Sequence, residues 1–167
     1  MSGALTQAGA KFYIGVDAQG DALAQNSDLT ESQYDALEWL EVKGVGNFGE
    51  TGTNTNVVSY DEHATEVTQK GKGISNAGDP EVECRRISDD PGQIQMRAAA
   101  QTKFSYAFKR ELDNAPNSTG NGTTYFNRGL VMGPRTPNGR NEDFDLEVYA
   151  LGLNQKQIIV EAAAGTP

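Results

Sequence analysis

The chain of 167 residues has the length of one domain, and its net charge of −9 excludes a protein that holds DNA or an anionic membrane by simple electrostatics. It has no apolar run long enough to span a membrane, and residues 1–20 lack the apolar block of a secretion signal. Its single cysteine excludes an intrachain disulfide framework.

Short alternating segments separated by polar loops fill the first half of the chain. Residues 1–10 are small and polar, which predicts a flexible N-terminal arm. Residues 18–36 predict a loop with one helical turn near 32–37, and the Gly, Thr and Asn of residues 46–56 predict a flexible loop. Strands are expected at residues 11–17, 39–45, 57–62, 66–74 and 80–88.

A helix is predicted to begin directly after Asp90. This residue is a good N-cap, Pro91 suits the first helical position, and Gln93 completes a capping pattern. The segment that follows, residues 94–103, is rich in helix formers. We therefore expect one α-helix packed against the flank of a β domain.

Further strands are expected after this helix, at residues 104–112, 123–132, 144–153 and 157–161. The alternation of apolar and polar residues in them indicates one buried and one solvent-facing side. The side chains predicted for the core are Trp39, Phe104, Tyr106, Phe108, Phe144, Leu146 and Val148. The pattern predicts a mainly β fold, a sandwich or barrel of about eight strands over residues 11–161, with residues 162–167 as a C-terminal tail.

No group of residues forms a catalytic or metal-binding motif. Residues 44–49 match G-x-G-x-x-G, but the residues that follow do not favour the helix that a dinucleotide site requires. His63 is expected in a solvated turn, and Cys84 is expected as a small buried apolar side chain. One Cys and one His cannot supply a usual zinc site, and the acidic loops lack EF-hand spacing. We therefore predict no catalytic residue, metal or cofactor.

Five stretches stand in a characteristic order along the chain. They are WLEVKGVGNFGE (39–50), TQKGKGISNAG (68–78), DDPGQ (89–93), FSYAFK (104–109) and TYFNRGLV (124–131). In this order and spacing they resemble the major tail tube protein of long, non-contractile-tailed bacteriophages. The resemblance covers roughly residues 11–161 and lies in the order of the pieces, because no single piece is a chemical motif.

This resemblance implies a structural protein without enzymatic activity. Members of the family form hexameric rings that stack into a hollow tube around a tape-measure protein, and double-stranded DNA later passes through without binding tightly. Tail terminator and baseplate proteins are the other implied partners, no membrane is involved, and the implied location is the virion tail after synthesis in the host bacterial cytoplasm. The same fold serves contractile tails, secretion needles and gene-transfer particles, and the sequence does not separate these.

Charge and topology agree with such a conduit. Carboxylates repel the phosphates of passing DNA, and closing six sheets into one ring removes exposed strand edges. We expect the N-terminal arm and the loop at 46–56 to make contacts between rings, through Gly46, Phe48, Gly49, Glu50, Thr53 and Asn54, with Phe48 as the apolar anchor. Acids on the polar faces of strands are expected to line the lumen: Glu66, Glu81, Glu83, Asp145 and Glu147.

An alternative interpretation is a monomeric ligand- or carbohydrate-binding β-sandwich. Four aromatic residues could line a concave pocket of such a module: Tyr60, Tyr125, Phe126 and Tyr149. A hydrolytic enzyme is disfavoured because no catalytic constellation is present.

Overall fold

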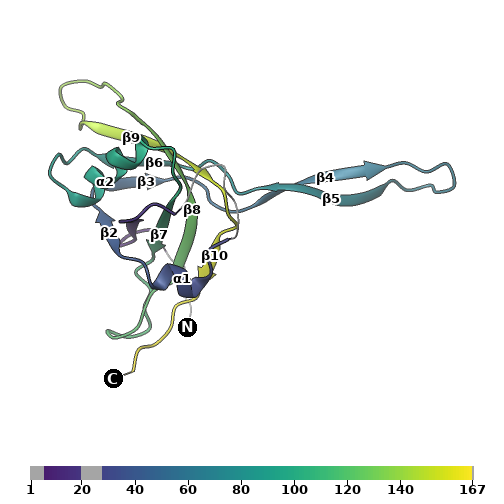
Figure 1. Cartoon of the computed structure of the whole chain (residues 1–167), viewed down its shortest axis with the longest axis horizontal. Coiled ribbons are helices and arrows are strands. Elements are labelled where there is room, and N and C mark those ends of the chain that lie inside the picture. The colour runs from purple at the N-terminus through teal and green to yellow at the C-terminus, as the bar shows by residue number, and fades with distance from the viewer. Residues whose placement is uncertain (1–5, 20–27, 167) are drawn as a thin grey trace.

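The computed structural model describes residues 6–19 and 28–166, and within these it contains ten strands and two short helices (Figure 1). Residues 1–5 of the expected arm, residues 20–27 of the expected loop and Pro167 lie outside the described residues. In chain order the elements are β1 (Lys11–Gly15), α1 (Glu31–Asp35), β2 (Trp39–Val42), β3 (Val45–Phe48), β4 (Asn54–Tyr60), β5 (Gln69–Asn76), β6 (Glu81–Arg85), α2 (Pro91–Ala100), β7 (Tyr106–Glu111), β8 (Thr124–Arg135), β9 (Leu146–Leu153) and β10 (Ile158–Val160).

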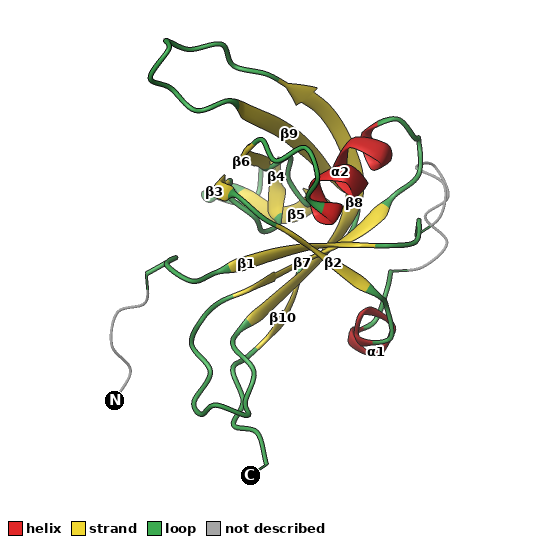
Figure 2. Cartoon of the chain, turned by 90° about the vertical axis from the view of Figure 1, so that its left-hand side faces the viewer, coloured by secondary structure: helices red, strands yellow, loops and turns green. Residues whose placement is uncertain are grey.

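Eight of the strands form one curved antiparallel sheet. Its order is β2-β1-β7-β8-β9-β6-β3, and β10 pairs with the first residues of β8. β2 and β3 lie at opposite ends of this order, yet only a short turn joins them in the chain. The sheet must therefore curve until its two ends meet, and Figure 2 shows β3 on the same side of the molecule as β1 and β2. The rings of Phe12 in β1 and Phe48 in β3 are in contact, with centroids 5.1 Å apart. The result is the mainly β, barrel-like sandwich that the sequence predicts.

The larger core fills the inside of this curved sheet, and α2 covers it. Phe108 lies in its middle and stacks on Phe12, with ring centroids 6.0 Å apart, while Tyr106 is also buried there. From α2, Met96 and Ala99 point into the same cluster. Burial of each large side chain contributes on the order of 2 kcal/mol.

Helix α2 begins as the sequence predicts. Asp90 is the N-cap, its carboxylate accepts a hydrogen bond from the Gln93 amide N–H at 3.0 Å, and Pro91 occupies the first turn. The Gln93 side chain donates to the carbonyl of Lys43 at 2.7 Å and to that of Arg85 at 2.8 Å. These bonds fasten the helix to the turn between β2 and β3 and to the end of β6.

A second, smaller cluster lies on the other face of the sheet. Tyr34 of α1 is fully buried and stacks on Phe126 of β8, with ring centroids 4.8 Å apart. Trp39, predicted for the core, is half-buried against this cluster together with the apolar side chains of β10. Ala107 belongs to the same cluster, so β7 is covered on both faces.

The predicted core is wrong at two positions. Phe104 is 49% exposed and Phe144 is 73% exposed, because β7 and β9 begin two residues later than the alternation suggests. In β9 the deepest apolar side chains are Tyr149 and Leu151, which lie on the face opposite to the predicted Leu146 and Val148. Leu146 is half-buried, whereas Val148 is buried on the outer face of the sheet. The inner face of β9 is the one covered by α2, and a single strand's alternation does not reveal which face a helix will cover.

The predicted loop at residues 46–56 is also wrong in part. Its first residues belong to β3, which pairs with β6, and its last residues begin β4. β4 and β5 pair only with each other and form a hairpin that projects far from the rest of the molecule (Figure 1).

Candidate assembly surface

The projecting hairpin of β4 and β5 exposes apolar side chains along its length. Each of five is more than half exposed: Val57, Val58, Tyr60, Val67 and Ile74. Val57 and Val58 are neighbours in one strand and so point to opposite faces of the hairpin. A two-stranded hairpin has little stability of its own in water, and apolar groups on both faces favour a partner that covers them. This element is therefore the strongest candidate for an assembly contact.

A pair of glycines marks the root of the hairpin. Gly52 lies where the chain leaves the sheet and has φ +132°, and Gly78 lies where it returns and has φ +98°. These are backbone conformations that favour glycine. A Cβ atom at Gly78 would lie 3.6 Å from the carbonyl oxygen of Gly52, so the two glycines are adjacent. Beyond this point the Gly78 carbonyl accepts a hydrogen bond from the Leu153 amide at 3.1 Å, which ties the returning chain to β9.

The residues predicted to contact a neighbouring ring do not lie together. Gly46 and Phe48 are in β3, whereas Gly49, Glu50 and Thr53 form the link to the hairpin and Asn54 begins β4. The ring of Phe48 packs against Phe12 of its own subunit, so it is not a free anchor in a mobile loop. The hairpin carries the largest group of apolar side chains that are free for such a role, and the sequence predicted it only as two ordinary strands.

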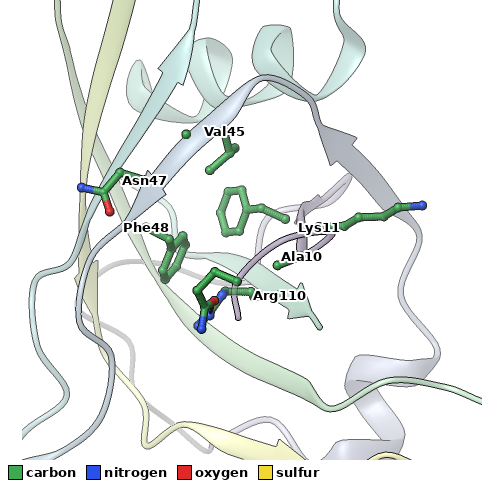
Figure 3. A pocket seen from close by; sticks show the side chains of 9 residues that line it. Ala10, Lys11, Val45, Asn47, Phe48 and Arg110 are labelled. Carbon is green, nitrogen blue, oxygen red and sulfur yellow. Dashed lines mark hydrogen bonds between the residues drawn. The ribbon is translucent and has the colours of Figure 1, made fainter. Parts of the chain in front are cut away.

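A pocket opens where β3 turns away from β1 (Figure 3). Its volume is about 460 Å³, and Phe12 and Phe48 supply its aromatic surface. In Figure 3 the ammonium of Lys11 points away from the ring of Phe48, whereas Arg110 lies next to that ring. The lining residues are Gln7, Ala10, Lys11, Phe12, Val45, Gly46, Asn47, Phe48 and Arg110.

Arg110 is the cation at the mouth of this pocket. Its guanidinium carbon lies 5.6 Å from the ring centroid of Phe48 and 5.3 Å from that of Tyr125. Its side chain also donates a hydrogen bond to the side-chain oxygen of Gln7. Across the sheet it faces Phe12 and Tyr125. Among the residues that the structure describes, no carboxylate forms an ion pair with Arg110.

The prediction that Glu147 lines a lumen is wrong. This side chain is only 2% exposed and lies beneath α2, where its Oε1 is 2.8 Å from Nη2 of Arg97 and 3.1 Å from Nε of Arg86. The hydroxyl of Tyr149 donates to its other oxygen. Burial would raise the pKa of the Glu147 carboxyl, but the hydrogen bonds from Arg97 and Tyr149 and the charges of both arginines together lower it. The carboxylate thus holds the helix to the sheet.

The other predicted lumen acids fall into two regions. Glu66 lies in the turn at the tip of the hairpin, far from the sheet. Glu81 and Glu83 are on β6, with side chains on the face opposite to the buried Val82 and Cys84, and Asp145 directly precedes β9. Glu81 forms an ion pair with Arg135, so part of its charge is balanced within the subunit.

The remaining chemically distinctive groups have structural surroundings. Cys84 is 1% exposed, and burial together with the nearby charge of Glu147 raises the pKa of its thiol to about 11. His63 is exposed in the tip turn of the hairpin. Within residues 6–19 and 28–166, no three His, Cys, Asp or Glu side chains gather as metal ligands, and no helix there is long and apolar enough to cross a membrane.

Chains of a prophage baseplate and of a contractile injection system share this fold over most of their length. A chain of the anti-feeding prophage baseplate, solved by cryo-EM with 6-fold symmetrisation, superposes with a TM-score of 0.64 at 10% identity, covering 96% of this chain and 97% of that one. A chain of the sheath/tube terminator of PVC, an extracellular contractile injection system, gives 0.67 at 8% identity, covering 95% and 98%. A chain of the sheath-tube complex of the same system gives 0.63 at 8% identity, covering 91% and 88%. No family model and no curated protein matches the chain.

Proposed function

We propose that this chain is the tube subunit of a phage tail, and that it assembles as hexameric rings stacked into a hollow conduit for DNA. The observation that carries the proposal is the full-length likeness of its fold to chains of a 6-fold baseplate and of a sheath-tube complex. The order of the five tube-like sequence stretches supports it independently.

The surface of the subunit also supports self-assembly. A hairpin with exposed valine, isoleucine and tyrosine side chains on both faces is costly for a protein that works as a monomer. A second copy of the chain can cover these groups, because a repeating assembly brings every hairpin against the same surface of a neighbour. The hairpin is thus proposed as the contact between rings, in place of the loop at 46–56.

Within this proposal the tube belongs to a non-contractile tail, as the sequence resemblance implies. Two of the structures that share the fold come from a contractile injection system, and the non-contractile assignment rests on the sequence resemblance, which implies that one fold serves both kinds of particle. A tape-measure protein would occupy the lumen before DNA does, with terminator and baseplate proteins at the two ends. Glu83 and Asp145 remain the proposed lumen acids, because neither has an ion-pair partner within the described part of the chain.

Electron microscopy of the purified protein at increasing concentration tests the proposal. We expect stacked rings with six-fold symmetry in end views. A monodisperse 17.9 kDa species at high concentration would contradict it and would favour the ligand-binding module instead. Adding the tape-measure protein of the same particle should fix the length of the tubes, whereas its omission should give tubes of variable length.

A further inference from the structure

The pocket beside Arg110 combines a cation without a described ion-pair partner and an aromatic surface. The Arg110 guanidinium lies near two aromatic rings and donates a hydrogen bond to Gln7, which leaves further N–H groups of its fork without a described carboxylate partner. The rings of Phe12 and Phe48 add apolar surface beside it. A group that fits this site carries a carboxylate for Arg110 and an apolar side chain for the rings.

The tip of the hairpin offers this combination. Its turn contains three carboxylates, those of Asp61, Glu62 and Glu66, and none of them forms an ion pair among the described residues. On either side of the turn, Tyr60 is 70% exposed and Val67 is 73% exposed. The tip therefore carries negative charge and apolar groups, both without partners.

We propose that the tip of the hairpin, residues 60–67, of one copy of this chain docks into the Arg110 pocket of a neighbouring copy. A carboxylate of the tip pairs with the Arg110 guanidinium, which keeps its contacts with the rings of Phe48 and Tyr125. Tyr60 and Val67 lie against the aromatic surface of the pocket. The inference rests on the proposed self-assembly and names the two surfaces that meet in it.

The occupant is a second copy because the hairpin cannot serve its own subunit. It extends away from the curved sheet that carries the pocket (Figure 1), so its tip does not reach that pocket in the same chain. The other acidic segment with an exposed aromatic is the loop from β8 to β9, which contains Glu142, Asp143 and Phe144. That loop belongs to the main body and already lies near the outer ends of β6 and β9. The tip is favoured because it stands clear of the body.

Disulfide trapping tests this contact directly. Asn47 lines the pocket and is exposed, and His63 lies exposed in the tip, so Asn47→Cys and His63→Cys place one thiol on each proposed surface without removing a charge. When the two variants, each with one added cysteine, are mixed and oxidised, we expect a disulfide-linked heterodimer at several times the yield of either homodimer. Cys84 is buried and will not interfere. Asn138→Cys, in the β8–β9 loop, is the matched control for the rival occupant.

Charge reversal then tests the pairing. Arg110→Glu alone, and Asp61→Lys with Glu62→Lys, should each raise the protein concentration needed for assembly at least tenfold. The chain that carries all three changes should regain most of the loss, because the opposite charges meet again. Two control variants make the same charge changes elsewhere: Lys103→Glu matches Arg110→Glu, and Glu142→Lys with Asp143→Lys matches the pair in the tip. Both controls should leave the concentration needed for assembly nearly unchanged. Circular dichroism spectra and melting temperatures identify any variant that fails to fold.

Each outcome decides one of the two proposals. Tubes that form without the 47–63 cross-link overturn the docking inference and leave the tube function standing. A cross-link without tubes supports the docking and contradicts the tube function. If neither tubes nor the cross-link form, both proposals are overturned. A cross-link of Asn47→Cys to Asn138→Cys, and not to His63→Cys, overturns the docking inference and assigns the pocket to the β8–β9 loop.

Discussion

At the scale of single residues, Glu147 shows that strand alternation can place a buried side chain on the wrong face. The pattern of β9 placed this acid on the solvent side, but the structure buries it because α2 brings Arg97 to the same place. Arg97 is far from it in the sequence, so no local pattern announces the pair. The sequence did contain one indication of the buried face, because Leu151 and Leu153 follow Tyr149 at spacings of two and four residues and so lie on its side of the strand.

Removing the charge of Glu147 should destabilise the subunit in a pH-dependent way. We expect Glu147→Gln to lower the free energy of unfolding by about 2–3 kcal/mol at neutral pH, less than for a fully buried pair because both arginines reach solvent. The pKa of the carboxyl is lowered in the folded state, so its contribution is complete above the unfolded value of about 4.3 and is lost as the pH falls through the folded value. Denaturant unfolding at several pH values should show the two proteins converging at low pH. A difference independent of pH would contradict this account.

Phe104 and Phe108 have similar neighbours in the sequence, but only Phe108 is buried in the core. Phe108→Ala should cost about 3–5 kcal/mol of unfolding free energy, because its ring fills the middle of the larger core. Phe104→Ala removes the same atoms from a half-exposed ring and should cost less than about 1 kcal/mol. Chemical denaturation of both variants measures the difference. Equal losses of unfolding free energy would mean that Phe104 is buried like Phe108, as the alternation at residues 104–108 predicts, and would contradict its exposed position.

At the scale of elements, the sequence predicted most strands but not all of their partners. The strands at 57–62 and 66–74 exist with shifted bounds, yet they form a separate hairpin, and β3 was missed because its Gly and Asn suggested a loop. Strand propensity is local, whereas pairing depends on where the whole sheet curves. The cap at Asp90 was predictable because capping depends on adjacent residues alone.

The hairpin should be dispensable for folding and necessary for assembly. Residues 53–76 can be replaced by a two-residue Gly-Ser link that keeps Ala77, which packs against the larger core, because Gly52 and Gly78 are already neighbours. We expect an unchanged melting temperature within a few degrees and no tubes by electron microscopy, since the larger core contains no side chain from β4 or β5. Normal tubes from the shortened chain would refute the assigned role of the hairpin.

Helix α2 depends on one close approach to the sheet. A Cβ atom at Gly92 would lie 2.0 Å from the carbonyl oxygen of Glu41, so Gly92→Ala must push the helix off β2. The expected loss is several kcal/mol or failure to fold, read from thermal unfolding. Gly46→Ala is the matched control, because a Cβ there meets nothing within 4 Å. Similar stability for the two variants would mean that α2 packs differently.

At the scale of the whole molecule, the net charge of −9 bears on the passage of DNA that the proposed function requires. The sequence could list acids on strand faces, but it could not say which of them pair with arginines, because Arg135 and Arg97 reach Glu81 and Glu147 only through the folded sheet and helix. In a hexameric ring, each remaining acid would be repeated six times around a narrow channel, which raises its effect on a passing polyanion.

Reversing the unpaired acids should slow the passage of DNA. In a particle carrying Glu83→Lys and Asp145→Lys, we expect normal tubes and slower DNA ejection at low salt, because lysines bind phosphates with release of counterions. The difference should shrink at high salt, which serves as the internal control. Ejection rates equal to those of the unmodified particle at low salt would place both residues away from the lumen.

The glycine pair at the root of the hairpin has a mechanical consequence. Both chain passages between the curved sheet and the hairpin run through a residue without a side chain, so rotation there meets no side chain of that residue. In a tube joined by such hairpins, bending would concentrate at these swivels while each ring kept its shape. The flexural stiffness of such a tube would then depend on two glycines per subunit as well as on the barrel wall.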